Sequence, residues 1–323
     1  MRALVAAELN RLRSRRLTLI TLLVVVVAAG LFQFAVHSAV SPPSAEELAA
    51  AQTQLERDLQ QYEKDKEVNA AAEQDCLDQG GRPEDCDFKP RLEMYVSPAV
   101  PFAEIASQAL TFAAVFAGLG VFLVGASSIG AEYTSGSISN WLTFVPQRWK
   151  VFTAKALAMV LGAGLAGTVV VGGTLAVTAV LASSNDLDLA GGRALIASAA
   201  RGVGLVVALG LVGYGIALIA RHTAAAMGVL VGYGLLTIVV NILFNVLPAL
   251  QRVKQFLPEN NLLAFLNKGH SYTDFYPGVG VDGEGFSSVE RTISITQGGT
   301  YWLLLTAITL AAALLIFRRR DVV

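Results

Sequence analysis

Residues 17–40 read LTLITLLVVVVAAGLFQFAVHSAV, and this run contains no acidic residue, lysine or arginine. A helix needs about 20 mostly apolar residues to cross the roughly 30 Å hydrocarbon core of a membrane, so the run is long enough to span one. Arginines before it and small residues around Ser38 and Ala39 also fit a cleavable signal peptide. A signal-peptide core is only about 7–15 residues long, however, and the longer run favours an uncleaved anchor.

Five further apolar runs follow along the chain, at residues 107–128, 151–182, 202–220, 224–247 and 300–317. Of the 323 residues, 54% are hydrophobic and only 15% are charged, whereas about 25% of the residues of a soluble domain are charged. Because lipid offers no partner for backbone amides, spans of this length must be helices. The sequence therefore predicts an all-α polytopic membrane protein with six transmembrane helices.

The short segments between the runs predict the orientation of the chain. With both termini in the cytoplasm, the segments on that side hold twelve basic residues and only three acidic ones. Short cytoplasmic loops are normally rich in lysine and arginine, so this arrangement is favoured over its opposite. We expect a multi-pass protein of the bacterial plasma membrane with both termini in the cytoplasm. The basic residues are Arg2, Arg11, Arg13, Arg15, Arg16, Arg148, Lys150, Lys155, Arg221, Arg318, Arg319 and Arg320, and the acidic residues are Glu8, Glu132 and Asp321.

Residues 1–16 and 318–323 form the two cytoplasmic ends. In residues 1–16, apolar side chains recur at helical spacing, with Glu8, Arg11 and Arg15 on the other side. This pattern predicts an amphipathic helix that lies in the membrane interface with its arginines toward anionic lipid headgroups. A plain cluster of arginines that sets the topology is the alternative interpretation.

Residues 41–98 form a predicted helical outer domain between the first and second spans. The domain holds fourteen acidic and six basic residues, and it contains Cys76 and Cys86, the two cysteines of the chain. In an oxidising compartment this close pair predicts a disulfide bond, and two unrelated free thiols are the alternative. Five acidic residues gather around the cysteines, but they lack the regular spacing of a calcium-binding loop, which favours a solvated acidic surface. They are Asp75, Asp78, Glu84, Asp85 and Asp87.

Residues 248–299 form a second outer segment, in which short helices are expected to precede a loop or a short strand. Two charged residues lie close to spans on the outer side, Glu104 and Arg201. Such residues either reach the interface along their own side chains or line a substrate path, and both interpretations stay open. Gly228 and Gly232 form a GxxxG motif typical of close helix packing, which is weak evidence in a chain so rich in glycine. A denser glycine run lies at Gly210, Gly213 and Gly215.

The sequence contains no catalytic motif. The patterns that mark phosphate-binding loops, zinc proteases, serine hydrolases and dithiol redox sites are all absent. The three histidines, His37, His222 and His270, lie far apart and on both predicted sides of the membrane. We therefore expect this chain not to be an enzyme and to hold no metal and no cofactor.

Residues 130–150 connect the second and third spans on the cytoplasmic side. A short helix from Glu132 to Leu142 is expected, with Ile138 and Leu142 facing lipid and Glu132 facing water. Lys155 is expected to anchor the next span at the lipid headgroups. Such a helix along the membrane offers a rigid handle to a partner outside it, and a plain interfacial loop is the alternative.

This segment resembles the coupling region of exporter-class (type 2) ATP-binding-cassette permeases. In that family a glutamate is followed by Gly-Thr or Gly-Ser, a leucine-rich stretch, a Pro-x-[Ser]-Arg element and a lysine that opens the third span. The resemblance covers nearly the whole chain in layout, but only residues 132–155 in specific pattern. Here Ser137 replaces the commoner threonine, and Trp141-Leu142 stands for the leucine pair. The matching residues are Glu132, Tyr133, Gly136, Ser137, Ile138, Leu142, Pro146, Arg148 and Lys155.

The resemblance implies a division of labour between chains. The membrane subunit of the family docks a separate ATPase, which carries ATP and Mg²⁺, and it pairs with a second copy or a sister permease. The coupling helix after the second span sits in a groove of that ATPase, where Glu132 contacts it, Gly136 allows close approach and Arg148 fixes the exit into the third span. The residues implied to couple to the ATPase are Glu132, Tyr133, Gly136, Ser137, Pro146 and Arg148.

Taken together, these patterns predict the permease subunit of an ATP-driven exporter of an amphiphilic substrate, surrounded by membrane lipid and without a nucleic-acid partner. A signalling or scaffold protein whose outer domain binds a partner without transport is the alternative from another class. A membrane-embedded enzyme is disfavoured by the missing catalytic motifs. An ion-coupled transporter is disfavoured because no carboxylate lies clearly inside a span.

Overall fold

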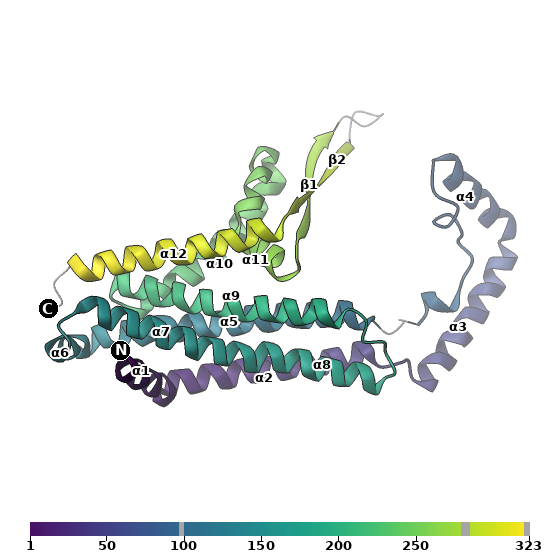
Figure 1. Ribbon diagram of the computed structural model, residues 1–323. Coiled ribbons are helices and arrows are strands. Elements are labelled where there is room, and N and C mark those ends of the chain that lie inside the picture. Colours follow the sequence, from purple (N-terminus) through teal and green to yellow (C-terminus); the bar gives the residue numbers. More distant parts are fainter. Residues whose placement is uncertain (97–99, 279–284, 320–323) are drawn as a thin grey trace.

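The computed structural model describes residues 1–96, 100–278 and 285–319, and its long apolar helices run alongside one another in a single bundle (Figure 1). Six of these helices are long and apolar enough to cross a membrane, as predicted. They are α2 (Arg16–Val40), α5 (Phe102–Thr134), the continuous helix α7–η2–α8 (Arg148–Ser184), α9 (Gly192–Ala220), α10 (Thr223–Val246) and α12 (Ile295–Arg319). The fold is the expected helical multi-pass membrane protein, with one two-stranded hairpin in addition.

Several membrane helices are longer than the apolar runs that predicted them. Helix α5 spans Phe102–Thr134 instead of 107–128, and α9 begins at Gly192 instead of 202. A helix satisfies its backbone hydrogen bonds internally, so it continues past the apolar run for as long as its residues tolerate helical geometry. Of the predicted tail, Arg318 and Arg319 end α12, and the predicted charges Arg320 and Asp321 lie outside the described residues.

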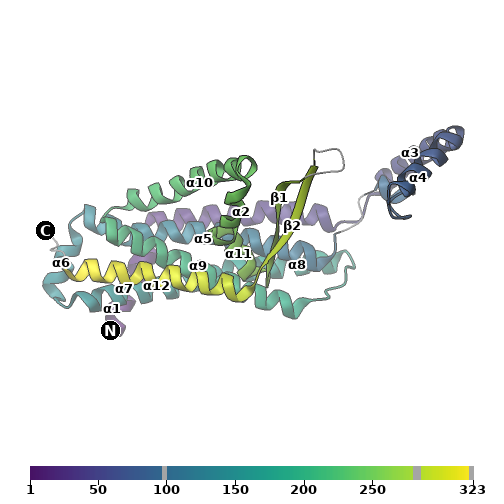
Figure 2. The same ribbon diagram turned by 90° about the horizontal axis from the view of Figure 1, so that it is seen from above.

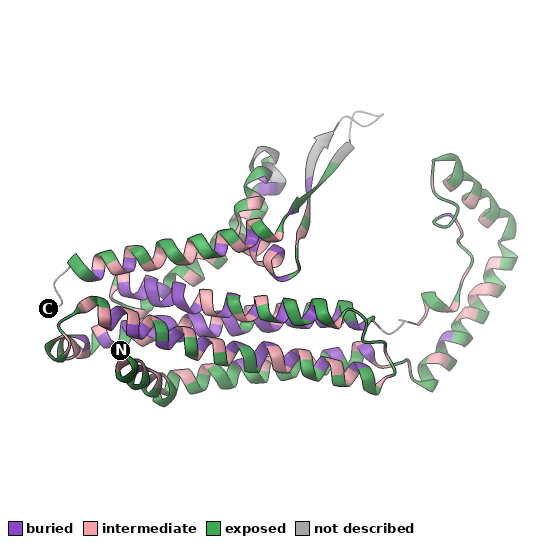
Figure 3. Cartoon of the chain, viewed as in Figure 1, coloured by how far each residue is buried: buried purple, intermediate pink, exposed green. Residues whose placement is uncertain are grey.

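Helix α5 lies at the centre of the bundle and packs along α9 (Figure 2). In the most apolar part of each helix, 67% of the residues of α5 and 50% of those of α9 are buried, against 11% for α2 and 6% for α10. The buried residues accordingly gather along the middle of the bundle (Figure 3). A Cβ on Gly125 would lie 2.2 Å from the carbonyl oxygen of Gly210, and one on Gly213 would lie 2.2 Å from that of Phe122. These glycines therefore let the two backbones touch.

The third span contains an irregularity that its apolar pattern did not predict. Helix α7 (Arg148–Gly167) passes into one π-helical turn, η2 (Thr168–Gly172), and continues as α8 (Gly173–Ser184). A π turn widens a helix locally and is frequent at functional sites. Hydrophobic periodicity cannot reveal such a turn here, because nearly every residue around it is apolar or small.

The segment between α2 and α5, predicted to lie on the outer side, projects away from the bundle (Figure 1). It consists of α3 (Ala45–Lys64), α4 (Lys66–Asp78) and the short turn η1 (Leu92–Met94). The hydroxyl of Tyr62 donates a 2.6 Å hydrogen bond to Glu73, which links α3 to α4 and raises the pKa of Tyr62 to about 12. The hydroxyl of Tyr95 donates to Asp58 at 2.6 Å and holds the end of η1 against α3. The segment is thus a small folded unit, as predicted.

Cys76 and Cys86 form the predicted disulfide bond. Beside it, Arg82 pairs with two of the acidic residues, at 3.1 Å from Glu84 and 2.8 Å from Asp85. Among the residues that the structure describes, no group of three His, Cys, Asp or Glu side chains is arranged to hold a metal ion.

Replacement of both cysteines by serine is expected to loosen this loop without affecting the bundle. A disulfide that closes a loop with a sequence separation of 10 contributes about 2–3 kcal/mol by restricting the unfolded chain. Limited proteolysis should therefore cut the variant between positions 76 and 86 much faster than the oxidised wild type, and as fast as the reduced wild type. Equal cleavage of variant and oxidised protein would show that the bond does not hold the loop.

The segment between α10 and α12, also predicted to lie on the outer side, begins with two short helices and ends in the hairpin. Its elements are η3 (Pro248–Phe256), α11 (Pro258–Leu266), β1 (His270–Gly278) and β2 (Gly285–Ile293). The strands are antiparallel, with His270 opposite Ile293. Asp274 is fully buried and lies 2.7 Å from Arg291 and 3.3 Å from Lys254, so η3 and both strands share one ion-pair group. The predicted order of short helices before a strand is observed, with two strands instead of one.

Candidate functional site

A short helix, α6 (Ser137–Phe144), lies at the end of the bundle that also holds α1 (Arg2–Ser14) and the end of α12 (Figure 1). Gly136 separates α6 from α5 with a φ of 68°, a left-handed conformation that glycine adopts at no steric cost. Pro146 restricts the residue before it to extended conformations, so the helix cannot continue through it. The expectation of one helix from Glu132 onward was wrong, because the chain turns at Gly136 and Glu132 belongs to the last turn of α5.

One side of α6 packs onto the ends of the membrane helices. Ile138 is 1% exposed and belongs to a hydrophobic cluster with Phe152 of α7 and Phe317 of α12, and Leu142 packs against the same cluster. The expectation that this side faces lipid was therefore wrong. The other side is open, and Phe144 is 85% exposed there. The exposed residues of α6 are Ser139, Asn140, Thr143 and Phe144.

Buried charges lie directly behind α6. The ammonium group of Lys155 donates hydrogen bonds of 2.8 Å to Glu132 and of 2.8 Å to Glu8. Side-chain exposure is 4% for Lys155, 5% for Glu132 and 8% for Glu8. The expectations that Glu132 faces water, that Lys155 reaches the headgroups and that Glu8 faces away from the apolar side of its helix were wrong. Each of these side chains instead forms an ion pair inside the protein.

Two arginines complete this group. The guanidinium of Arg15 donates to Glu132 at 3.1 Å and to the backbone carbonyl oxygens of Ser127 and Ser128 at 2.6 and 3.2 Å. Arg11 lies 3.8 Å from Glu132 and 3.8 Å from Glu8, and its guanidinium stands 4.4 Å from the ring centre of Trp141 in α6. We call Glu8, Arg11, Arg15, Glu132 and Lys155 the charge cluster.

The charge cluster holds four helices together. Glu8 and Arg11 lie on α1, Glu132 on α5 and Lys155 on α7. Arg11 also contacts α6, by stacking on the ring of Trp141. Burying a charge is costly unless opposite charges and hydrogen bonds compensate it, and breaking such a group leaves an uncompensated charge behind. The cluster therefore fixes one arrangement of these helices and, with it, the position of α6.

Sequence reasoning missed this pairing. Two features of the sequence indicated the pairing: a lysine inside the apolar run 151–182 and a single glutamate in the basic residues 1–16. A charge in an apolar environment normally has a partner. The partners, however, are 147 residues apart in the chain. No local pattern connects residues at that separation.

A comparison with protein families places the chain. The model of a family described as "ABC-2 family transporter protein" matches residues 4–322. The chain belongs to the ABC-2 transporter family. No curated protein matches the sequence. The family match includes all six membrane helices and every residue of the charge cluster, so the whole arrangement is part of an ABC-2 membrane transport component.

Other predicted coupling residues of this ABC-2 chain also bind its own helices. Arg148 donates a 3.2 Å hydrogen bond to the carbonyl oxygen of Phe317, and the guanidinium of Arg221 lies 5.6 Å from the ring centre of Tyr133. Ser137 accepts a 3.1 Å hydrogen bond from its neighbour Ser135. These contacts gather the ends of α5, α7, α9 and α12 around α6. A role of these residues in binding an ATPase stays a prediction.

The two candidates for a substrate path lie elsewhere. Arg201 donates from two nitrogens to the carbonyl oxygen of Leu266, at 3.1 and 2.7 Å, and Ser198 donates to the same oxygen at 2.7 Å. Arg201 thus fastens the end of α11 to α9. Glu104 is exposed in the first turn of α5 and accepts a 3.4 Å hydrogen bond from Gln108. The structure does not join Glu104 and Arg201 in one site.

Proposed function

We propose that this chain is the membrane-spanning permease subunit of an ATP-driven exporter and that α6 is its contact with a separate ATPase. One observation carries the proposal: α6 is fixed to three other helices by the charge cluster, and its opposite side is exposed. A helix held in this way transmits a movement of the docked ATPase to the membrane helices behind it, whereas a flexible loop would not. ATP and Mg²⁺ then act on the partner chain.

The exposed side of α6 has the character of a docking surface. Phe144 is a large aromatic side chain that is 85% exposed beside three small polar residues. Aromatic residues are enriched in the cores of protein interfaces, and polar residues form the rim around them. The excess of basic residues in the segments at this end of the bundle supports a cytoplasmic position, where an ATPase has access to ATP.

An aromatic recess supports an amphiphilic substrate. The rings of Phe32 and Phe112 stack at 4.3 Å, and Phe112 stacks on Phe116 at 4.2 Å. Gln108 and Asn267 line the same recess of about 550 Å³, which is within the usual range of about 300–1,000 Å³ for small-molecule sites. Stacked rings beside amide groups suit a molecule with an apolar body and a polar end.

A second membrane subunit belongs to this proposal. Only 6% of the apolar part of α10 and 11% of that of α2 is buried within the chain. These faces contact either lipid or a second copy or sister permease. Pairing of two six-span subunits would enclose a substrate path between them.

Replacement of Phe144 by alanine is expected to weaken binding of the candidate ATPase about tenfold, the usual effect of removing an aromatic residue at the centre of an interface. The matched control is Phe34→Ala, which removes a 77% exposed phenylalanine from α2. Affinity for the purified ATPase and ATP turnover should be measured with the permease in lipid nanodiscs. Ser139→Arg, on the same exposed side, should lower both quantities as well.

Charge reversal at Glu132 is not a suitable test of docking, because it would disrupt the charge cluster itself. If Phe144→Ala, Ser139→Arg and Phe34→Ala all bind the ATPase as the wild type does, α6 is not the contact. If no ATPase binds at all, the acidic outer segment that stands away from the bundle favours the second candidate, a partner-binding protein without transport.

A further inference from the structure

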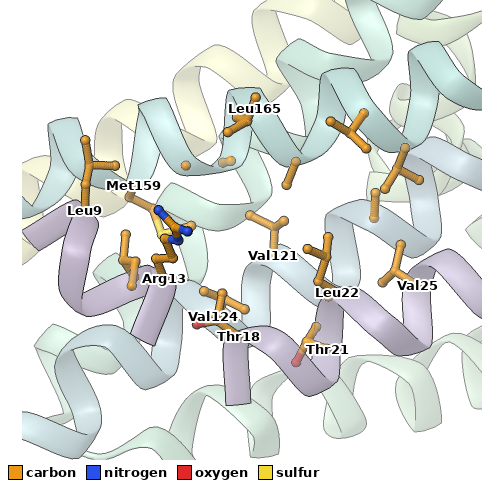
Figure 4. A pocket seen from close by; sticks show the side chains of 18 residues that line it. Leu9, Arg13, Thr18, Thr21, Leu22, Val25, Val121, Val124, Met159 and Leu165 are labelled. Atoms are coloured by element: carbon orange, nitrogen blue, oxygen red, sulfur yellow. The ribbon is translucent and has the colours of Figure 1, made fainter. Parts of the chain in front are cut away.

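A recess opens where α1 turns into α2. Helix α1 ends at Ser14, Arg15 adopts an extended conformation and α2 begins at Arg16. The recess between α1, α2, α5 and the third span has a volume of about 420 Å³ (Figure 4). It extends along the third span as far as the π turn, where Val169 and Val170 line it.

The recess reaches into the bundle and is more than a groove on its surface. Its inner wall includes Val25, Val121 and Met159, which are between 2% and 9% exposed. Its outer wall includes Leu22 and Leu165, which are 39% and 69% exposed and lie where a membrane helix meets lipid. A lipid chain can therefore enter from the membrane and lie between helices.

One charged side chain faces this apolar space. The guanidinium of Arg13 points into the recess beside Met159 (Figure 4). Its neighbours Arg11 and Arg15 are bound in the charge cluster, but the described part of the chain offers Arg13 no carboxylate within ion-pair distance. The hydroxyl-bearing Thr18 lines the same end of the recess. A positive charge at the mouth of an apolar cavity calls for a ligand with an anionic head and an apolar tail.

We propose that this recess binds one acyl chain of an anionic phospholipid, with the lipid phosphate on Arg13. The recess lies where the chain first enters the membrane, which is the depth at which a headgroup meets its acyl chains. Its volume is within the range of small-molecule sites, and an arginine binds a phosphate through charge-assisted hydrogen bonds. The inference does not depend on which side of the membrane holds the N-terminus, and it is separate from the proposed ATPase contact.

Two pairs of variants test the headgroup and the acyl chain separately. Arg13→Gln removes the proposed phosphate contact, and Arg16→Gln removes the same charge three residues away, outside the recess. Gly162→Leu fills the recess, because a Cβ on Gly162 would meet only Leu12, at 3.7 Å. Gly30→Leu is its control, because a Cβ on Gly30 would meet nothing within 4 Å.

The full chain should be reconstituted in vesicles of phosphatidylglycerol and phosphatidylcholine in equal amounts, extracted in detergent and analysed by native mass spectrometry. We expect the wild type, Arg16→Gln and Gly30→Leu to retain phosphatidylglycerol in preference to phosphatidylcholine. Arg13→Gln should lower that preference about fivefold, the effect of losing one arginine near anionic headgroups, and Gly162→Leu should abolish retention. Equal retention of both lipids by the wild type would overturn the proposal, as would unchanged retention in Arg13→Gln or in Gly162→Leu.

Discussion

Replacement of Lys155 by methionine is expected to lower the free energy of unfolding by about 3–5 kcal/mol, the usual cost of leaving a buried charge unpaired. Lys155 bridges Glu8 and Glu132, and without it the one cation that the described residues leave near Glu8 is the more distant Arg11, at 3.8 Å. Denaturant titration in mixed micelles would measure the effect. The control is Lys150→Met. The ammonium group of Lys150 lies 5.7 Å from the ring centre of Trp149, a weak contact, so this variant should change the free energy of unfolding by less than about 1 kcal/mol.

A double variant separates the charge effect from a loss of packing. In Glu8→Gln combined with Lys155→Met, the carboxylate that lost its partner is neutral, so part of the lost stability should return. If the double variant is as unstable as the sum of the two single variants, the two residues are not coupled. If Lys155→Met is as stable as Lys150→Met, the charge cluster does not hold these helices.

Replacement of Gly213 by valine is expected to prevent the bundle from forming, at a cost of at least about 3 kcal/mol, the upper end of the usual cost of overpacking. A Cβ at Gly213 would lie 2.2 Å from the carbonyl oxygen of Phe122, and backbone cannot yield as a flexible side chain can. Helices α5 and α9 would have to separate along their whole contact. The amount of monodisperse protein after detergent extraction and its unfolding temperature are the measurements.

Gly232→Val is the matched control for this change. A Cβ on Gly232, or on Gly228, would meet nothing within 4 Å, so valine should be tolerated there. Equal yield and unfolding temperature for Gly213→Val and Gly232→Val would contradict the close crossing of α5 and α9.

The glycines show how much of the helix packing could be predicted from the sequence. Among the described residues, none comes within 4 Å of a Cβ placed on Gly228 or Gly232 of the GxxxG motif. Gly125 and Gly213 belong to no such motif, yet a Cβ on either would lie 2.2 Å from a carbonyl oxygen of the facing helix. The sequence shows where small residues lie. It does not show which of them another helix approaches, because that depends on how the spans are arranged.

The same limit applies to the site. The hydrophobic runs correctly predicted six helices able to span a membrane, and the coupling pattern around Glu132 led to the right family. The burial of Glu132 and Lys155 was not predicted, because each charge was assigned to the nearest water or headgroup. In the folded chain Lys155 is buried and paired with Glu8, which is distant in the sequence, and is not solvated by water. Similarly, the end of α5 was placed too early because the left-handed turn at Gly136 was not foreseen.

The backbone contact between α5 and α9 has a mechanical consequence. Two helices whose main chains touch at glycine cannot roll or slide past each other without a steric collision, so they move as one rigid body. Through Glu132 the charge cluster adds α1 and α7 to that body, and α6 becomes its short lever arm. Helix α10, which is hardly buried in the chain, stays outside it. Any cycle of opening and closing should therefore appear as a hinge between this four-helix block and α10, while distances within the block stay constant.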